Sequence, residues 1–376
     1  MVLWLAAGNS MAAQPVHFAV LGGVPANPSQ EAPVRELLAA IAARPGIDFI
    51  LDDGNLKGAQ EPCTDTLLQE RQALLNSSPL PLVFVPGARD WVDCQQAAAG
   101  QFDPLERLDQ LRDLIFATSD SMGAAPLPLL HESEVTRFRN FHENTEWQQG
   151  PVLFVALNVP GNNNHYVDAG GRNGEFEDRT VANRFWLEHA LRSARQHHPA
   201  AVVIALEGDP GLGVQSRHGP FDWLDFRTPS QRDGYLEFKQ DLLKFAQQYD
   251  GPILLINQAH GHAGNPAQGA TVTNPAFRLS QPLHRKNGSA LSKIWQLELN
   301  AQNDPRHWVS VEIVPARETS FKASLQTVPA HPATPAVEPT PAPAPAASAL
   351  PPVALPVPVL QIPGTNDDDS ASSPRP

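Results

Sequence analysis

The chain has 376 residues, of which 41% are hydrophobic, so it has enough apolar side chains for one large core or two medium ones. Its formal net charge is −13 at pH 7, and Lys and Arg form no dense run anywhere. We therefore expect no nucleic-acid partner, because a phosphate backbone needs a clustered cationic surface. No internal segment approaches the ~20 consecutive apolar residues of a transmembrane helix.

The N-terminal part of the sequence predicts three strand–turn–helix units in succession. Short aliphatic runs predict buried strands at residues 16–21, 47–51 and 80–85. Apolar residues at helical spacing predict helices at residues 31–43 and 64–76. Repeated units of this kind favour a sheet whose strands are largely parallel.

The remainder of the chain continues the alternation of strands and helices. We predict, in order, a mostly helical polar region at 102–144, a strand at 152–158, a helix at 183–197, a strand at 200–206, a helix at 234–249 and a strand at 253–256. Residues 294–299 and 308–314 alternate polar and apolar side chains on either side of a turn at 300–305. This pattern predicts a C-terminal antiparallel hairpin.

Residues 1–14 form a possible signal-like segment, with a short apolar core and small residues at Ser10-Met11-Ala12. The positive start of such a signal is missing, because the first Lys or Arg of the chain is Arg35. We predict a periplasmic or secreted protein, with a cytoplasmic location as the alternative.

Residues 328–376 form a Pro/Ala-rich tail that contains 14 of the 38 prolines and includes an acidic run near its end. Such a segment cannot bury enough apolar surface to offset the entropy of ordering it, so we predict a disordered tail with polyproline II character. The tail is either a passive extension or a contact for a Pro-binding or cell-envelope partner.

Polar residues follow several of the predicted strands. Asp53 and Asn55 come after the second strand, Arg89 after the third, and Glu207 after the strand at 200–206. Sites in open α/β sheets lie where strands end, which makes these residues candidates for a functional site. The alternative for Asp53 and its neighbour Asp52 is that they cap a turn.

Two histidines, His260 and His262, follow the aliphatic strand at 253–256. Two neutral imidazoles at a strand end could hold a metal ion or an anion. The alternative is that both rings form hydrogen bonds with the backbone of their loop.

Four strand-end motifs occur in order along the chain: Gly22-Gly23-Val24-Pro25, Gly54-Asn55-Leu56-Lys57, Pro86-Gly87-Ala88-Arg89-Asp90-Trp91 and Ala259-His260-Gly261-His262. Their order and spacing over about residues 16–318 resemble a bacterial branch of the calcineurin-like metallophosphoesterase family. The resemblance implies one domain over these residues, folded as a four-layer α/β/β/α sandwich with two mixed sheets flanked by helices. It also implies phosphoester hydrolysis by two metal ions that activate a bridging hydroxide.

Most of the metal ligands that this resemblance implies are replaced in the sequence. Gly23 and Pro25 stand where an Asp and a His are implied, and Asn55 stands where the carboxylate that bridges both metals is implied. Glu207 is nearest to the position of a further His ligand. Only His260 and His262 of the fourth motif match the ligands that the resemblance implies.

The third motif departs from the pattern in two ways. Ala88 replaces an implied Asn ligand, and Arg89 stands at the position of the implied catalytic His. A permanently charged guanidinium cannot act as the general acid and repels divalent cations, but it favours a bound anion. The catalytic residue is therefore unknown and an intact di-metal centre is not expected. The alternative for Arg89 is a structural ion pair with Asp90 or Asp93.

Two functions remain open at this stage. The chain is either a metal-dependent phosphoester hydrolase with an impaired metal centre, or a non-catalytic exported protein that binds a small phosphate-containing anion or acts as a scaffold. The candidate ligands of one divalent metal ion are His260, His262, Asn55, Glu207 and Asp53, and the candidate anion-binding residues are Arg89 and Asn55.

The two cysteines, Cys63 and Cys94, lack the C-x-x-C spacing of a metal or redox motif. They form either one bridge or two buried thiols. Both follow motifs at adjacent strand ends, which favours the bridge, and an oxidising compartment would keep it closed.

Overall fold

The computed structural model of the protein describes residues 14–169, 171–212, 232–259, 270–274, 276–283, 292–300, 304–316 and 318–329, and for residues 270–274 the backbone alone. His260, His262, nearly all of the signal-like segment and all but the first two residues of the tail lie outside this range. Among the residues that the structure describes, no helix is both long and apolar enough to cross a membrane.

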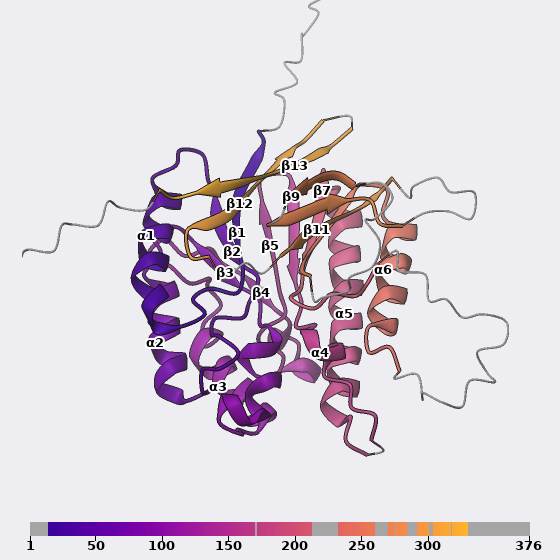
Figure 1. The fold of residues 1–376 in the computed structure, drawn as a ribbon. Coiled ribbons are helices and arrows are strands. Elements are labelled where there is room, and N and C mark those ends of the chain that lie inside the picture. The colour runs from indigo at the N-terminus through magenta and orange to yellow at the C-terminus, as the bar shows by residue number, and fades with distance from the viewer. Residues whose placement is uncertain are drawn as a thin grey trace, which may run out of the picture. The chain divides into compact units, whose positions relative to one another are not determined.

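One mixed sheet has five strands in the order β13-β12-β1-β2-β3 (Figure 1). Its strands are β1 (Val16–Leu21), β2 (Phe49–Asp52), β3 (Leu82–Phe84), β12 (His307–Val314) and β13 (Ser320–Thr327). β1, β2 and β3 run parallel, while β12 and β13 are added antiparallel. The predicted parallel pairing of the three N-terminal strands is confirmed.

The second mixed sheet has eight strands in the order β4-β5-β6-β7-β8-β11-β10-β9. Its strands are β4 (Leu130–His131), β5 (Thr145–Gln149), β6 (Val152–Ala156), β7 (Ala201–Ala205), β8 (Ile253–Gln258), β9 (Ala270–Asn274), β10 (Phe277–Ser280) and β11 (Ile294–Leu299). The four central strands β6, β7, β8 and β11 are parallel, so their C-terminal ends lie at one edge of the sheet.

Helices cover the outer face of each sheet (Figure 1). α1 (Glu31–Ala42), α2 (Asp65–Asn76) and α3 (Pro104–Ile115) pack on the five-stranded sheet, and α5 (Gly174–His197) and α6 (Leu236–Gln248) pack on the eight-stranded sheet. Short turns of helix occur at α4 (Gly161–Asn164), Pro28–Gln30, Ala88–Asp90, Val92–Gln95, Ala97–Ala99, Glu132–Glu134 and Thr136–Phe138. The predicted four-layer α/β/β/α sandwich is confirmed.

Local sequence signals set where the helices begin. The side chain of Thr64 accepts a hydrogen bond from the backbone N–H of Leu67 at 3.2 Å and starts α2. The side chain of Asp103 accepts from Leu105 at 2.8 Å, and Pro104 occupies the first position of α3, where its missing N–H costs nothing.

An aromatic cluster holds the two sheets face to face. Phe18 and Phe49 of the five-stranded sheet stack with ring centroids 5.1 Å apart. Phe154 of the eight-stranded sheet packs edge-on against Phe49 at 5.1 Å, and Trp147 stacks on Phe154 at 5.1 Å. Because large aromatic side chains dominate burial, this cluster fixes how the strand ends of the two sheets face each other.

The predicted C-terminal hairpin is wrong. The residues at 294–299 form β11, which pairs with β8 and β10 in the eight-stranded sheet, whereas β12 pairs with β1 and β13 in the five-stranded sheet. Alternating side chains show that a strand has two different faces, but they do not identify its neighbour. β13 also extends the domain to Thr327, beyond the boundary expected at residue 318.

The mostly helical region predicted at 102–144 is only partly helical. α3 ends at Ile115, and the chain then forms an irregular segment, β4 and two short helical turns. Gly123 adopts a positive φ of 98°, and a Cβ there would lie 2.2 Å from the carbonyl oxygen of Leu80. A left-handed residue in so close a contact cannot continue a right-handed helix.

Candidate functional site

Residues from four strand ends meet at the C-terminal edge of the two sheets. Asn55 follows β2, Arg89 follows β3, Glu207 follows β7, and Gln258 is the last residue of β8. Gly54 and Asn55 both have positive φ angles, of 76° and 63°, which turn the chain sharply after β2. Asn tolerates this backbone conformation better than most residues, so the local sequence suits the turn.

The side-chain amide of Asn55 links three of these strand ends. Its Nδ2 donates hydrogen bonds to Glu207 Oε1 at 2.7 Å and to Gln258 Oε1 at 3.0 Å. Its Oδ1 accepts from the backbone N–H of Arg89 at 2.9 Å. Both ends of the buried amide are therefore engaged, and its NH₂ group bonds to the Glu207 carboxylate and to the Gln258 side chain.

Glu207 is fully buried and accepts further hydrogen bonds from backbone N–H groups. Its Oε2 accepts from Ala88 at 2.9 Å and from Gly161 at 2.7 Å. Space around it is tight, since a Cβ on Gly87 would lie 2.8 Å from Glu207 Cγ and 2.7 Å from Asn55 Oδ1. Glycine at position 87 is thus required for the close approach of these side chains.

Asp90 is a buried carboxyl that ties the loops after β2 and β3 together. It accepts hydrogen bonds from the backbone N–H groups of Asn55 at 2.8 Å, Leu56 at 2.8 Å and Gly87 at 2.7 Å. Burial raises the pKa of Asp90 to about 6, although these three hydrogen bonds act to lower it.

Asp52 and Asp53 are fully buried, and none of their four carboxyl oxygens has a hydrogen-bond partner in the structure. Burial raises the pKa of Asp53 well above its usual value, and the charges of Glu207 and Asp52 raise it further. Burial also raises the pKa of Asp52, and the charge of Asp90 raises it further. The backbone N–H of Gly54 lowers the pKa of Asp52, although it does not have the geometry of a hydrogen bond to that carboxyl. Burial without hydrogen-bond partners therefore disfavours the charged form of both carboxyls.

Two cationic side chains lie at the same edge. Among the described residues, the half-buried guanidinium of Arg89 is not within ion-pair distance of a carboxylate. Burial raises the pKa of Asp93, and Arg89 lies near enough to that carboxyl for its charge to lower the pKa. Lys57 is buried, and its Nζ donates to the carbonyl oxygens of Gly58 at 3.2 Å and Glu61 at 2.9 Å. Burial lowers the pKa of Lys57, while Asp90 is the largest of the charges that raise it.

These contacts do not fit a pair of divalent metal ions. A bridging ligand must present oxygen lone pairs to both metals, whereas Asn55 presents N–H groups to Glu207 and its oxygen is already bonded to Arg89 N. Both oxygens of Glu207 also accept hydrogen bonds from the protein. Within the described ranges, no three His, Cys, Asp or Glu side chains are grouped so that they could hold a metal ion.

The structure brings together Asn55, Glu207 and Arg89, which the sequence singled out, and it places Asp53 next to them. His260 and His262 lie outside the described residues, so their predicted role stays a prediction. Sequence reasoning missed Gln258, whose Nε2 donates to the carbonyl oxygen of Asp53. A polar residue at the end of an otherwise aliphatic strand was the available signal.

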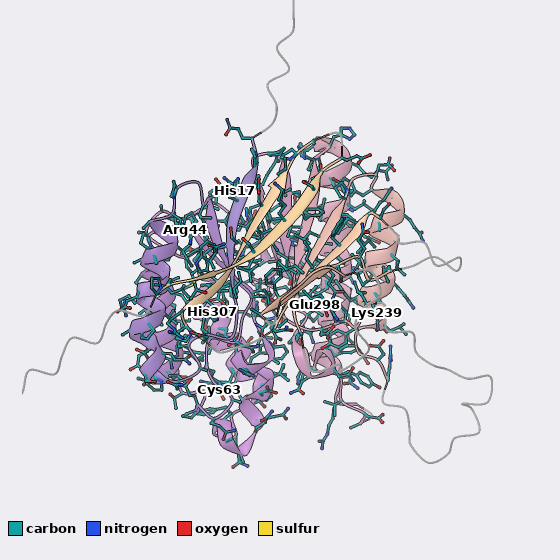
Figure 2. All side chains as sticks on the ribbon, turned by 45° about the horizontal axis from the view of Figure 1, so that its top comes forward. His17, Arg44, Cys63, Lys239, Glu298 and His307 are labelled. Carbon is teal, nitrogen blue, oxygen red and sulfur yellow. A yellow bond between two sulfur atoms is a disulfide. The ribbon has the colours of Figure 1, made fainter. Side chains whose placement is uncertain are left out.

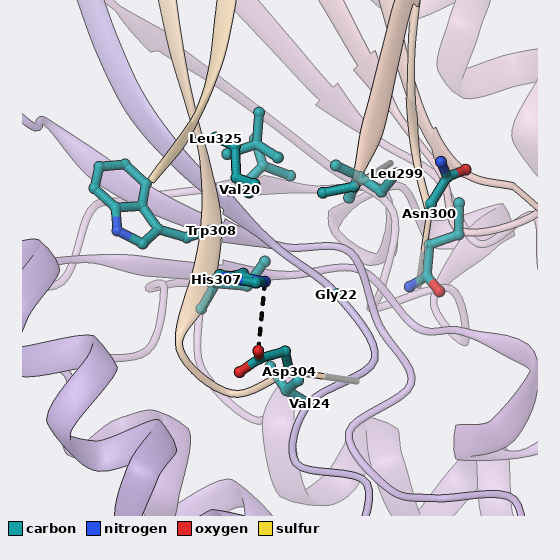
Figure 3. Close-up of a pocket in the computed structure, with 13 residues that line it drawn as sticks. Val20, Gly22, Val24, Leu299, Asn300, Asp304, His307, Trp308 and Leu325 are labelled. Atoms are coloured by element: carbon teal, nitrogen blue, oxygen red, sulfur yellow. Dashed lines mark ion pairs between the residues drawn. The ribbon is translucent and has the colours of Figure 1, made fainter. Parts of the chain in front are cut away.

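A small cavity of about 40 Å³ is lined in part by Gln258, which connects it to this network (Figure 3). It is lined largely by apolar side chains, and Asp304 and His307 form an ion pair at 3.6 Å within it. Arg89 is not among the residues that line this cavity.

Arg179 of α5 anchors the loop that delivers Gly161 to Glu207. The fully buried guanidinium donates to the carbonyl oxygens of Asn158 at 3.1 Å and Asn164 at 2.9 Å. It also pairs with Glu175, and it lies 5.5 Å from the ring centroid of Trp91. Arg179 and His165 lower the pKa of Glu175 to about 2, although burial alone would raise it.

A disulfide joins Cys63 and Cys94, with their Cα atoms 5.6 Å apart (Figure 2). Both residues are buried together with Ala99, and the partly buried Phe102 packs against them. The bond connects the loop that carries Asn55 to the loop that carries Arg89 and therefore restrains the site from outside the hydrogen-bond network.

We expect the disulfide to stabilise the protein by about 3 kcal/mol, because it closes a long loop in the unfolded chain. The Cys63→Ser/Cys94→Ser variant should unfold at a correspondingly lower urea concentration than the unreduced wild type. Thiol titration of the unfolded, unreduced wild type should find no free thiol. Two free thiols would refute the bridge.

The sequence matches no protein-family model, and it matches no curated protein. Among solved structures, it is similar to GAP50, the anchor in the inner membrane complex of Plasmodium, with 10% identity, a TM-score of 0.41 and coverage of 84% of this chain and 88% of that chain. The sulfate thiohydrolase SoxB of Thermus thermophilus in complex with glycerol has 14% identity and a TM-score of 0.37, covering 80% and 42%. The NAD nucleotidase NadN of Haemophilus influenzae has 9% identity and a TM-score of 0.41, covering 84% and 51%. The matched region thus spans about half of NadN and less than half of SoxB.

Proposed function

We propose that the chain is a non-catalytic protein of the metallophosphoesterase type, which binds a small phosphate-containing anion instead of hydrolysing it. The observation that carries this proposal is the Asn55 amide, whose N–H groups bond to Glu207 and Gln258. A bridging carboxylate would be repelled by Glu207 unless metal ions lay between them. An amide makes the same contact attractive without any metal.

The proposed anion site is the outer face of this network at Arg89. Its guanidinium is half-buried and unpaired among the described residues, and a guanidinium suits the planar, bidentate recognition of a phosphate group. The proposed export of the protein is supported by the Cys63–Cys94 bridge, because disulfides persist in oxidising compartments.

Two measurements on the purified full chain separate this proposal from the hydrolase alternative. We expect no tightly bound Mn, Fe, Zn or Ca in stoichiometric amount, and no hydrolysis of a generic aryl phosphate above the buffer rate. Two tightly bound metal ions, with turnover that is lost on His260→Ala, would overturn the proposal in favour of a hydrolase.

Binding of inorganic phosphate tests the anion site itself. At a phosphate concentration ten times its Kd, we expect the free energy of unfolding to rise by about 1.4 kcal/mol. The Arg89→Gln variant should lose this gain, whereas Arg184→Gln, which changes an exposed arginine of α5, should keep it. If phosphate stabilises both variants equally, Arg89 is not the anion ligand.

A further inference from the structure

The outer edge of the five-stranded sheet is a long strand with no neighbour. β13 has eight residues and pairs along its whole length with β12, from Ser320 opposite Val314 to Thr327 opposite His307. Within the part of the chain that the structure describes, no strand lies on its other side. A row of backbone N–H and C=O groups is therefore available for pairing with another strand.

The two faces of β13 differ in chemistry. Phe321 is buried in the core between the sheets, and Ala323 and Leu325 are half-buried against the same core. On the opposite face, Lys322 lies beside Glu312 of β12 at 3.2 Å, and Ser324 is exposed. A strand added to this edge must continue the apolar row on one face and the polar row on the other.

We propose that β13 pairs antiparallel with β13 of a second copy of this chain. A two-fold axis perpendicular to the sheet keeps the same face of both copies on the same side. Residues that lie opposite each other must therefore both have odd numbers or both have even numbers. With the axis at Ala323, Phe321 lies opposite Leu325 of the second copy and Ala323 lies opposite itself. All three apolar residues then meet apolar partners, which a shift by two positions in either direction does not achieve.

The same register brings no like charge against Lys322, the charged residue of this edge. Lys residues on edge strands normally discourage pairing, because they bring a charge against an incoming strand. Here the charge of Lys322 is already balanced by Glu312 within the chain, and the register places Lys322 opposite Ser324 of the second copy. Pairing of two five-stranded sheets in this way gives one continuous sheet of ten strands, which lies at the upper end of the usual range.

Substitutions of the exposed Ser324 test the proposal by sedimentation of the full chain over a range of concentrations. Ser324→Glu places two opposite-charge pairs in the dimer, and Ser324→Lys places two like-charge pairs there. Relative to the wild type, we expect the dimer dissociation constant to fall roughly 2- to 30-fold for Ser324→Glu and to rise by a similar factor for Ser324→Lys. Both shifts should shrink in high salt.

A cysteine at the axis tests the register. In an antiparallel pair, Cα atoms of opposed residues are about 4.5–5.5 Å apart, which a disulfide can span. Ala323→Cys should therefore form a covalent dimer under mild oxidation, and Ser324→Cys, which faces the other side and lies off the axis, should not. A wild type that sediments as a monomer at every concentration overturns the proposal. A dimer that neither responds to charge at position 324 nor crosslinks through position 323 also overturns it.

Discussion

The Arg179→Met variant is expected to lose about 3–5 kcal/mol of unfolding free energy, which is typical when one partner of a buried charge pair is removed. Arg179 is fully buried, and it is the donor to Asn158, Asn164 and Glu175. Its removal leaves the Glu175 carboxylate without its main counter-charge and several oxygens without a donor. Urea unfolding followed by circular dichroism, with wild type and variant at the same pH, measures the loss.

Arg184→Met provides the matched control on the same helix. Arg184 is 44% exposed and pairs with Asp241 at 3.1 Å, and exposed ion pairs contribute about 0–1 kcal/mol. Both variants remove one positive charge from α5 and add a Met side chain. The difference between their losses of unfolding free energy therefore measures the contribution of the buried network around Arg179. A loss for Arg179→Met no larger than that for Arg184→Met would show that the network does not stabilise the fold.

Much of the layered fold follows from local patterns in the sequence. β1, β2 and β7 consist mainly of apolar residues that favour burial, the helices α1 and α2 have apolar residues at helical spacing, and α2 is also capped by Thr64. β5 was missed because Thr145-Glu146-Trp147-Gln148-Gln149 is polar at four of its five positions. A strand near the edge of a sheet needs few apolar side chains, so its pattern is weak.

The partners of strands were harder to predict than the strands themselves. β11 and β12 are close in sequence, yet they belong to different sheets. Which neighbour a strand takes depends on the packing of the whole sandwich, for example on the contact between Trp295 of β11 and Phe321 of β13. Short-range alternation contains no information on such contacts.

The candidate site shows the same division. The strand-end positions of Asn55, Arg89 and Glu207 could be predicted, because parallel strands bring their C-terminal ends to one edge. The identity of their partners could not be. Residues 207 and 258 reach Asn55 from strands more than a hundred residues away in the chain, as the bonds to Asn55 Nδ2 show. The network is a property of the fold, and it appears only when the two sheets are packed together.

The buried pair Asp52 and Asp53 leads to the second large prediction. The pKa of each folded-state carboxyl is raised above its ordinary value of 3.8, so the native state binds more protons than the unfolded state. Stability is then highest below that ordinary value and falls as pH rises through the range up to the folded pKa, by about 1.4 kcal/mol per pH unit for each group. The free energy of unfolding should therefore decrease from pH 4 toward neutral pH.

The Asp52→Asn/Asp53→Asn variant removes this loss, because an amide cannot ionise. At pH 7 we expect it to be more stable than the wild type, and near pH 4 we expect the two proteins to be similar. The amide N–H groups will lack acceptors, but an unpaired amide in the interior costs less than an ionised carboxyl. Urea unfolding of both proteins across this pH range measures the effect.

Asp250→Asn is the control, because it makes the same chemical change in a side chain that is fully exposed to solvent. A wild type whose stability rises from pH 4 to pH 7 relative to the double variant would contradict the prediction, since it would mean that the two carboxylates are favourably paired in the folded state. The same result would also weaken the proposed non-catalytic function. Ionised carboxylates next to Glu207 would need a cation beside them, and the four oxygens of Asp52 and Asp53, which have no hydrogen-bond partner in the structure, could then bind one.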